Sequence, residues 1–335
     1  MAKPTIELNN LATKLKRETK VSLFCHIRPD GDSIGSTVAL KLALEKVGVE
    51  VDVYCTDAIP ERFFFLPMTK CVKTSFEKGD ISTKVGALAF IDEYSALIAM
   101  DCADIMRTGD FQEVFAKHKN TYNIDHHVSN NYYAKYNYVV DCAANCENAY
   151  RIITEMGVEI DADMANLLAM GISTDTGNYC HKNVTPDTLF ISGKLKEKGA
   201  DLNKIHYHMF TKQTKERAKL FGLVMSKIRY MLDDRLAIAT VTLKDIALSG
   251  ATADQTEGFI DFVMGIDCVE VGICLLETSE NTYKVSFRSK GADVNAVATA
   301  FGGGGHILAS GCKLNGEYEE VVDRLRFEVS KNLID

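Results

Sequence analysis

The chain has 335 residues, of which 46% are hydrophobic and 25% are charged, and its formal net charge is −8. This is the composition of a globular protein with room for two domains, and it excludes a disordered chain, a collagen-like repeat and a disulfide-stapled mini-protein. No uncharged apolar run of 18 residues occurs, and the first four residues, Met-Ala-Lys-Pro, lack the apolar core of a signal peptide. We therefore expect a cytoplasmic protein.

Charge and cysteine usage narrow the function classes further. Proteins that hold long duplex DNA through phosphate contacts usually present a basic face, which a net charge of −8 does not favour. Ten cysteines are scattered along the chain, Cys142 and Cys146 alone lie close together, and no C-x-x-C pair occurs. Structural zinc and thioredoxin-like redox chemistry are therefore poorly supported, and buried, reduced thiols are expected.

The first part of the chain alternates between strand and helix patterns. Short apolar runs predict strands, and apolar residues at helical spacing predict helices. In chain order we expect a helix over 7–19, a strand at 21–25, a helix over 33–47, strands at 49–55, 86–91 and 96–100, a helix over 112–118, a strand at 121–124, and helices over 145–156 and 162–172. This alternation predicts an α/β domain over 1–195 with a mainly parallel sheet and helices on both faces.

The second part of the chain begins with helical, charge-rich patterns over 185–198 and 203–231 that carry no strand signal. They predict a helical connector over 196–232. Beyond it we expect strands at 236–243, 269–277 and 283–288 and helices near 256–263, 294–301 and 318–329. Residues 233–335 are therefore predicted to form a second, smaller α/β domain.

The strongest local signal follows the first predicted strand. There, His26, Asp30 and Asp32 lie between a strand and a helix, at the edge where open α/β sheets bind ligands. One interpretation is structural, with Asp32 or Ser33 capping a helix that begins at Ile34. The histidine favours the other interpretation, because the spacing H-x3-D-x-D supplies three metal ligands in one loop.

Three further segments end in aspartate or histidine. Asp101 closes one predicted strand, Asp125, His126 and His127 follow the next, and Asp175 lies at the end of a predicted helix. Taken singly, each has a structural interpretation as a turn residue or a satisfied histidine. Two adjacent histidines project differently, so at most one normally joins a given metal while the other faces substrate.

Considered as a set, these segments predict a metal site. The carboxylates of Asp30, Asp32, Asp101 and Asp175, supplemented by imidazoles, suit Mn²⁺, Mg²⁺ or Fe²⁺ better than a thiolate zinc site would. Two divalent ions would bring a charge of +4 against four aspartates at −4. Such a cage is close to neutral and has room for an incoming phosphate.

The order of these motifs, H-x3-D-x-D, a strand-end Asp, D-H-H and T-D-T-G, resembles that of the DHH phosphoesterases. Phe287-Arg288-Ser289 and the four glycines between Phe301 and His306 resemble the DHHA1 domain. Within this superfamily, the short two-domain chain is similar to the nanoRNase branch, whose members degrade oligoribonucleotides and dephosphorylate 3′-phosphoadenosine 5′-phosphate (pAp). Other members act on linear or cyclic dinucleotides.

The resemblance implies a role for each motif residue. The ligands of two Mn²⁺ ions, with Mg²⁺ or Fe²⁺ as alternatives, would be His26, Asp30 and Asp101 for one and Asp32, Asp101, His126 and Asp175 for the other. Asp101 would bridge the two ions. His127 would face the scissile phosphate, and Asp125 would orient a neighbouring histidine. Such a pair of ions activates water and neutralises charge on the phosphate oxygens.

The glycine run after the predicted helix over 294–301 has two interpretations. One is a helix cap followed by a flexible joint. The other is a ligand-binding backbone, because His306 and an apolar stretch follow at once and place the run inside a packed domain. With the planar guanidinium of Arg288, the resemblance implies a substrate-binding surface. Its residues would be Arg288, Ser289, Gly303, Gly304, Gly305 and His306, together with His127 of the first domain.

Two positions depart from the family pattern. Residues 144–148 read Ala-Asn-Cys-Glu-Asn where relatives have small hydroxyl residues, which places Cys146 near the second metal. Val128 stands where relatives often have proline. Neither change removes a catalytic group.

We therefore predict a cytoplasmic, metal-dependent phosphoesterase that hydrolyses short oligoribonucleotides and pAp. We expect it to bind these substrates and to bind neither long duplex DNA nor a membrane. A homodimer is one open alternative for its oligomeric state. An alternative is hydrolysis of cyclic or linear dinucleotide signals such as cyclic di-AMP, pApA or pGpG. Pyrophosphate hydrolysis is disfavoured because that substrate needs no base platform. A non-catalytic nucleotide sensor is disfavoured because every expected metal ligand is present.

Overall fold

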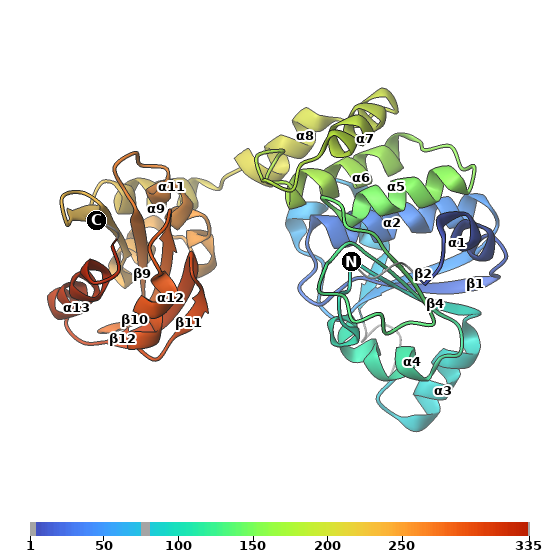
Figure 1. The fold of residues 1–335 in the computed structure, drawn as a ribbon, viewed down its shortest axis with the longest axis horizontal. Helices are drawn as coiled ribbons and strands as arrows, with labels where there is room; N and C mark the ends of the chain where they lie inside the picture. Colours follow the sequence, from blue (N-terminus) through green and yellow to red (C-terminus); the bar gives the residue numbers. More distant parts are fainter. Residues whose placement is uncertain (1–4, 75–80, 334–335) are drawn as a thin grey trace. The chain divides into compact units, whose positions relative to one another are not determined.

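The computed structural model describes residues 5–74 and 81–333. The chain divides into two compact units, Met1–Lys212 (unit 1) and Gln213–Asp335 (unit 2), as Figure 1 shows. The division falls directly after a short π-helical turn, Tyr207–Thr211. No helix in the described ranges is long and apolar enough to span a bilayer.

Unit 1 is built on a six-stranded sheet in which every neighbouring pair of strands is parallel. The strand order is β3-β2-β1-β4-β5-β6. The strands are β1 (Lys20–Phe24), β2 (Glu50–Cys55), β3 (Val72–Thr74), β4 (Ala96–Met100), β5 (Thr121–Asp125) and β6 (Tyr136–Val139). Because every strand points the same way, the carboxyl ends of β1, β4 and β5 share one edge of the sheet.

Helices cover both faces of this sheet, as predicted (Figure 1). One core cluster lies between the sheet and the helices α1, α2, α5 and α6, and a second lies on the opposite face under α3 and α4. The helices of unit 1 are α1 (Leu8–Leu15), α2 (Gly31–Lys46), α3 (Lys84–Glu93), α4 (Gln112–Lys117), α5 (Asn145–Glu155), α6 (Ala162–Asp175), α7 (Pro186–Glu197) and α8 (Leu202–His206).

The predicted strand at 86–91 is wrong, because these residues lie in α3. A short apolar run does not by itself distinguish a strand from a helix. Here Thr83 caps the helix by accepting the backbone N–H of Gly86, and the buried residues Ala87 and Phe90 are three apart, as helical spacing requires. The short strands β3 and β6 carry no clear sequence signal and were not predicted.

Unit 2 contains a second six-stranded sheet, in the order β11-β12-β10-β9-β8-β7. Strands β8 and β9 are parallel, and the other neighbours are antiparallel. The strands are β7 (Arg229–Met231), β8 (Leu236–Val241), β9 (Val271–Ser279), β10 (Thr282–Ser289), β11 (Gly304–His306) and β12 (Ala309–Asn315). Three of them, β7, β11 and β12, were not predicted.

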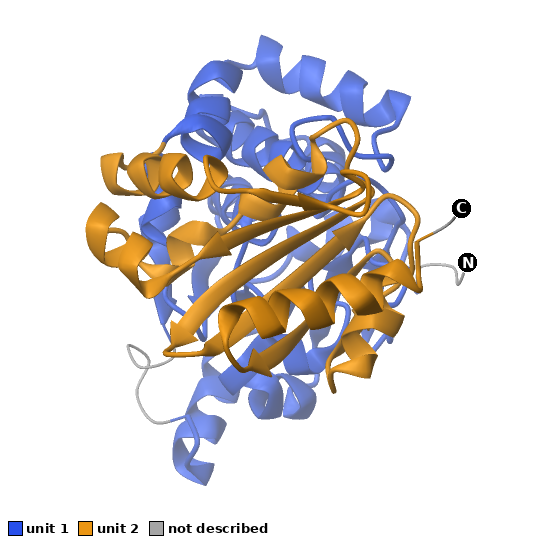
Figure 2. Ribbon diagram, turned by 90° about the vertical axis from the view of Figure 1, so that its left-hand side faces the viewer, with its two compact units in different colours: residues 1–212 blue, residues 213–335 orange. Residues whose placement is uncertain are grey.

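Helices also lie on both sides of the second sheet, as the unit 2 ribbon in Figure 2 shows. One cluster packs the sheet against α12 and α13, and the other packs it against α9 and α11. The helices of unit 2 are α9 (Lys215–Met225), α10 (Leu243–Ser249), α11 (Phe259–Met264), α12 (Val294–Ala300) and α13 (Tyr318–Ser330).

Two predicted elements of unit 2 have different bounds in the structure. The helical pattern expected to reach residue 231 ends at Met225 and gives way to β7. The strand expected over 236–243 ends at Val241, because the hydroxyl of Thr242 caps α10 by accepting the backbone N–H of Asp245. Residue propensity did not predict either boundary. The first depends on the three-residue strand β7 and the second on the cap at Thr242.

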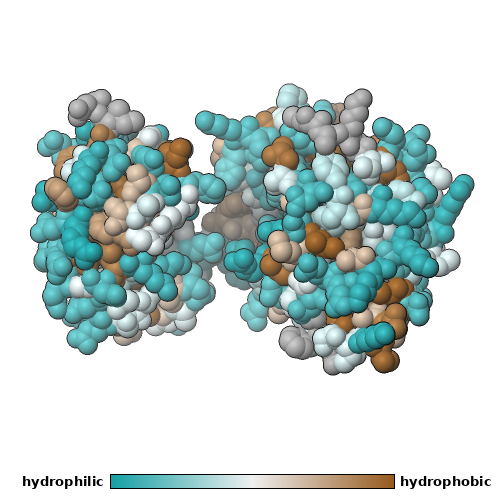
Figure 3. Space-filling view, turned by 60° about the horizontal axis from the view of Figure 1, so that its bottom comes forward, coloured by the Kyte–Doolittle hydropathy of each residue, from teal (hydrophilic) through white to brown (hydrophobic). Residues whose placement is uncertain are grey.

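On the face that Figure 3 shows, both units are largely hydrophilic, with apolar side chains scattered among charged ones. All ten cysteines are unpaired thiols, as predicted, and most are buried or half-buried. Cys180 and Cys268 are exposed, however, so the expectation of burial is wrong for these two.

Candidate metal centre

The carboxyl edge of the first sheet gathers the predicted site residues of unit 1. His26 follows β1, Asp101 directly follows β4, and Asp125 is the last residue of β5, with His126 and His127 next in the chain. Asp175 joins them as the last residue of α6. These aspartate and histidine side chains therefore meet at one edge of the sheet, although some are separated by almost half of the chain in sequence.

His26, Asp30 and Asp101 form one potential metal-binding group. Nε2 of His26 lies 3.4 Å from Oδ2 of Asp30 and 3.4 Å from Oδ2 of Asp101. Nδ1 of His26 lies 2.8 Å from the carbonyl oxygen of Ile27, an acceptor that keeps the proton on Nδ1. Nε2 is thereby left to act as the ligand atom.

The loop between β1 and α2 is fixed by local hydrogen bonds. Asp30, not Asp32 or Ser33, is the N-cap residue, and its Oδ1 accepts the backbone N–H groups of both those residues. The hydroxyl of Ser33 in turn accepts the backbone N–H of His26, at 3.1 Å. The capping interpretation and the metal-ligand interpretation therefore coexist at Asp30, because its Oδ2 points to His26.

Asp32, His126 and Asp175 form a second group. Nε2 of His126 lies 3.5 Å from Oδ2 of Asp175 and 3.8 Å from Oδ2 of Asp32. It also lies 3.4 Å from Oδ1 of Asp101. Nδ1 of His126 lies 3.0 Å from the carbonyl oxygen of Cys142, so this imidazole too directs Nε2 toward the carboxylates.

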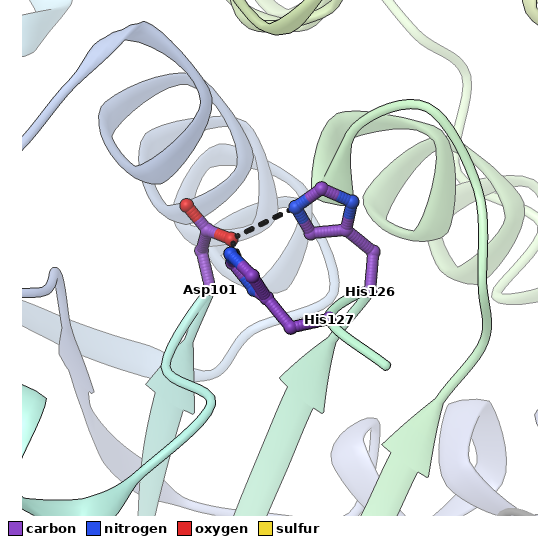
Figure 4. Close-up of side chains that lie close together, drawn as sticks. All are labelled: Asp101, His126 and His127. Atoms are coloured by element: carbon purple, nitrogen blue, oxygen red, sulfur yellow. Dashed lines mark ion pairs between the residues drawn. The ribbon is translucent and has the colours of Figure 1, made fainter. Parts of the chain in front are cut away.

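Asp101 links the two groups, because its two oxygens face different histidines, and it forms a third potential metal-binding group with His126 and His127. Oδ2 lies near His26, whereas Oδ1 lies near His126 and 3.6 Å from Nδ1 of His127 (Figure 4). The backbone of Asp101 is left-handed, with φ of 57°. Such a conformation is uncommon for residues other than glycine and is concentrated at functional sites.

His127 is held by a buried polar network that the sequence did not reveal. Its Nδ1 lies 2.8 Å from Oδ1 of Asp125, and Oδ2 of Asp125 accepts a hydrogen bond of 2.6 Å from the amide of Asn130. The same amide donates to Asn123 at 2.7 Å. Asn123, Asp125 and Asn130 are all buried. The sequence signal that could have revealed this network is Asn123, a polar residue within a predicted strand that needs a hydrogen-bond partner when buried.

Asp32 accepts hydrogen bonds from the amino end of α5. Its two carboxylate oxygens accept the backbone N–H groups of Asn145, at 2.5 Å, and Cys146, at 2.8 Å. The Sγ of Cys146 packs where Cβ atoms at Gly35 and Gly171 would intrude. Cys146, the departure from the family pattern, is thus fully buried beneath Asp32 and fills space between helices.

The clustered carboxylates hold more negative charge than the described side chains neutralise. Burial and the neighbouring charge of Asp101 raise the pKa of Asp32 to about 7. Burial and the charges of Asp32 and Asp101 raise the pKa of Asp175 to about 9. Burial also disfavours the charged form of Asp101, but the ion pairs with His126 and His26 outweigh it and lower the Asp101 pKa.

The histidines respond in the opposite direction. Burial opposes the charged form of His26, but contacts with Asp101 and Asp30 prevail and raise its pKa to about 10. Burial likewise opposes the charge on His126, while Asp101 and Asp32 raise its pKa to about 11. In the metal-free protein, bound protons therefore neutralise the negative charge of these carboxylates. Bound metal cations would displace those protons.

The donor set fits divalent cations. Oδ1 of Asp101 and Nε2 of His126 are buried and make no hydrogen bond within the described part of the chain, although buried polar atoms normally have one. In each of the three groups, the potential ligand atoms lie within 4.8 Å of one another. Carboxylate oxygens supplemented by imidazole nitrogens suit Mn²⁺, Mg²⁺ or Fe²⁺.

Comparison with known proteins identifies the family. Residues 20–172 match the N-terminal domain of the DHH family, and residues 234–334 match the DHHA1 domain. A bifunctional oligoribonuclease and PAP phosphatase, NrnA, from Thermus thermophilus is 31% identical over 94% of this chain and 91% of its own. The chain belongs to the DHH/DHHA1 family. It is a metal-dependent phosphoesterase related to NrnA.

Other relatives support the assignment of this phosphoesterase to the DHH/DHHA1 family. The NrnA of Bacillus subtilis is 26% identical over 88% of this chain and 89% of its own. An exopolyphosphatase-related protein from Bacteroides fragilis has a TM-score of 0.81 and 25% identity, covering 97% of this chain and 95% of that one. RecJ of Thermus thermophilus, solved with Mn²⁺, shares the fold at a TM-score of 0.52 and 12% identity over 97% of this chain and 55% of its own.

The DHHA1 domain of this phosphoesterase carries the predicted substrate-binding residues on β10 and β11. Arg288 and His306 both pair with Ala309 of β12, so their side chains project from the same face of the sheet. The hydroxyl of Ser289 donates to the carbonyl oxygen of Ala292. Arg288 and His306 are exposed and available to a ligand.

The glycine run is ordered by the sheet and is not a flexible joint. Gly302, with φ of 73°, ends α12, and Gly304 begins β11. A Cβ atom at Gly303 would lie 2.2 Å from the carbonyl oxygen of Gly311, so glycine is needed there for close strand approach. The N–H group of Gly303 donates to the carbonyl oxygen of Ala298 in α12, so this donor of the predicted ligand-binding backbone is not available to a ligand.

Proposed function

We propose that this phosphoesterase hydrolyses short oligoribonucleotides to mononucleotides and pAp to AMP. The observation that carries the proposal is the pair of His/Asp groups joined by Asp101, a donor set for two cations beside the partly exposed His127. Similarity to NrnA proteins over about nine-tenths of the chain supports the substrate class.

The ligands that would hold the two ions, Mn²⁺ in our proposal, are His26, Asp30 and Asp101 for one and Asp32, Asp101, His126 and Asp175 for the other. When bound, such ions supply Lewis-acid activation of water and stabilise the charge of the phosphoryl group. The protein's own contribution is orientation. Imidazole Nδ1 atoms bound to backbone carbonyls fix His26 and His126, so that both direct Nε2 to the ligand cage.

His127 is proposed to bind the phosphoryl group. Its side chain is 39% exposed, whereas its partner Asp125 is fully buried. Hydrogen bonding to Asp125 raises the pKa of His127 and keeps a proton on Nδ1, while burial opposes this effect. The raised pKa favours the imidazolium form, whose Nε2–H can donate to a phosphate oxygen of the substrate.

The DHHA1 domain is proposed to bind the rest of the nucleotide. Arg288 offers a planar guanidinium that suits a phosphate or stacks on a base, and His306 lies in register with it two strands away. Ser289 and the backbone of Gly304 and Gly305 complete the proposed surface, while Gly303 allows the close strand approach. We also propose a cytoplasmic location, since ten unpaired cysteines suit a reducing compartment.

A substrate panel assayed with Mn²⁺ tests the proposal. The panel holds pAp, RNA of two, five and twenty nucleotides, single-stranded DNA, cyclic di-AMP, pApA, pGpG and pyrophosphate. We expect the highest kcat/KM for pAp and for RNA of two to five nucleotides, with the twenty-nucleotide RNA and pyrophosphate far lower. The Asp101→Ala variant is the control for contaminating nucleases, because removing the shared ligand abolishes turnover.

Two results would contradict the proposal. A higher kcat/KM for cyclic di-AMP than for every RNA and pAp would assign the enzyme to signalling dinucleotides. Equal hydrolysis by the Asp101→Ala variant, purified in the same way and shown to be folded, would remove the metal centre from the mechanism.

A further inference from the structure

On the side of the second sheet that α9 and α11 partly cover, strands β10, β11 and β12 carry exposed cationic side chains, and we call this strip the open face. Along β10 and β12, buried residues alternate with exposed or half-buried ones, and the buried ones form the core with α12 and α13. The remaining positions therefore project from the other face. They are Thr282, Lys284, Ser286 and Arg288 on β10, Ala309, Gly311, Lys313 and Asn315 on β12, and Gly304 and His306 on β11.

The charge of this open face is unusual for the protein. None of the positions is acidic, although the chain has 46 acidic residues against 38 lysines and arginines. Lys284 and Lys313 lie directly opposite each other in the β10–β12 ladder, an arrangement that is unfavourable for like charges. Both are exposed, and neither forms an ion pair among the residues the structure describes.

The cations form a line that leads away from Arg288. Lys284 is four residues from Arg288 on the same strand, which corresponds to roughly 13 Å at about 3.3 Å per residue. Lys313 lies across the ladder from Lys284, at a Cβ separation of about 5 Å. Between the two ends lie Ser286, which has a small side chain, and its partner Gly311, which has none. A flexible polyanion can therefore lie along the strands and contact both ends.

We infer that Lys284 and Lys313 bind backbone phosphates of a single-stranded RNA beyond the nucleotide held at Arg288. The inference rests on the proposed function and extends it, because it predicts that strands longer than a dinucleotide gain affinity. A single-stranded nucleic acid is favoured over an acidic peptide because the open face continues from Arg288, where the nucleotide is proposed to bind, and carries cations spaced along it.

Binding measured without divalent ions tests the inference independently of hydrolysis. Fluorescein-labelled octaadenylate and diadenylate RNA are titrated in EDTA with the wild type, with Lys284→Gln/Lys313→Gln, and with Lys215→Gln/Lys244→Gln. The last is a matched control, because Lys215 and Lys244 are exposed lysines of unit 2 on α9 and α10 that lie off the open face. Both double variants remove the same charge.

We expect the Lys284→Gln/Lys313→Gln variant to bind octaadenylate about tenfold more weakly and diadenylate within twofold of the wild type. The slope of log K against log salt should become shallower by about 1.4, since each lost phosphate contact on a single strand contributes about 0.7. The control variant should bind both RNAs as the wild type does, with an unchanged slope.

Three results would overturn the inference: an unchanged Kd and slope for octaadenylate, an equal loss in the control variant, or an equal loss of affinity for a labelled hexaglutamate peptide. A failure of the proposed function is distinguishable from these. In that case the wild type binds octaadenylate with the expected slope but does not cleave it with Mn²⁺, and the assignment of the open face stands.

Discussion

His127 and Asp125 form a hydrogen-bonded pair in which the imidazole is partly exposed and the carboxylate is fully buried, with 2.8 Å between Nδ1 and Oδ1. The second oxygen of Asp125 is held at 2.6 Å by the amide of Asn130. The orientation of His127 therefore depends on an asparagine that lies three residues beyond it in the chain and does not reach the metal ligands.

Replacing Asn130 tests this dependence. We expect Asn130→Ala to lower kcat by about 10–100-fold, the usual effect of losing a residue that orients an active-site group. KM should change much less, because the metal ligands stay in place. The loss of a buried amide also costs about 1–3 kcal/mol of unfolding free energy, so the assay is run well below the measured Tm.

The neighbouring Asn131→Ala variant is the matched control, since Asn131 is exposed and its amide binds Asp104. It should keep wild-type kinetics. If both variants retain full kcat, Asp125 orients His127 without help from Asn130, and the network serves the fold alone.

The raised pKa values predict how stability changes with pH when the metal is removed. Asp175, with a pKa of about 9 in the folded protein, binds a proton that the unfolded chain has released above pH 4. His26, with a pKa of about 10, keeps a proton that the unfolded chain releases near pH 6.5. In both cases the folded state holds more protons, so the unfolding free energy falls as pH rises from 6 to 8.

Thermal unfolding in EDTA and in excess Mn²⁺ measures this effect. In EDTA we expect a lower Tm at pH 8 than at pH 6. The increase in Tm on adding Mn²⁺ should be larger at pH 8, because fewer protons then compete for the ligands. A Tm in EDTA that rises between pH 6 and pH 8 would show that the carboxylate cluster does not control stability in this range.

Gly171 of α6 tests the packing beneath Asp32. A Cβ atom there would lie 2.2 Å from Sγ of Cys146 and 2.9 Å from Oδ1 of Asp32. We expect Gly171→Ala to lower the unfolding free energy by about 1–3 kcal/mol through overpacking, and to weaken Mn²⁺ binding by displacing Asp32. Urea unfolding and a Mn²⁺ titration provide the two measurements.

Gly193→Ala is the control for this helix substitution. Gly193 lies in α7 with no atom within 4 Å of the added Cβ, so alanine should raise stability by about 0.5–1 kcal/mol. Combining Gly171→Ala with Cys146→Ala should recover part of the loss, since the sulfur is then absent. A Gly171→Ala protein as stable as the Gly193→Ala protein would contradict this account of the packing.

Arg288 is predicted to act in substrate binding and not in the chemical step. Arg288→Ala should raise KM for pAp and RNA about tenfold or more, as expected from losing a charge-assisted hydrogen bond worth about 1.5–3 kcal/mol, with kcat reduced much less. Arg326→Ala, an exposed arginine of α13, should leave both constants unchanged. An Arg288→Ala enzyme with lower kcat at unchanged KM would instead place Arg288 in transition-state stabilisation.

The sequence by itself determined the fold class, the parallel arrangement of the first sheet and the types of ligand in the site. Apolar runs such as 96–100 report strands directly, and aspartates or histidines at strand ends must meet where parallel strands share an edge. Local pattern failed at α3, where a short apolar run fits either element, and at β11 and β12, whose glycines and single lysine carry no strand signal.

The tertiary structure alone decided how those ligands are divided and supported. Packing places the two oxygens of Asp101 toward different histidines, sets Asp32 on the backbone of α5 and buries Asn130 against Asp125. The register of β12 brings Lys313 opposite Lys284. Each relationship joins atoms of different elements, and its geometry is fixed by burial and strand register, which residue spacing along the chain does not specify.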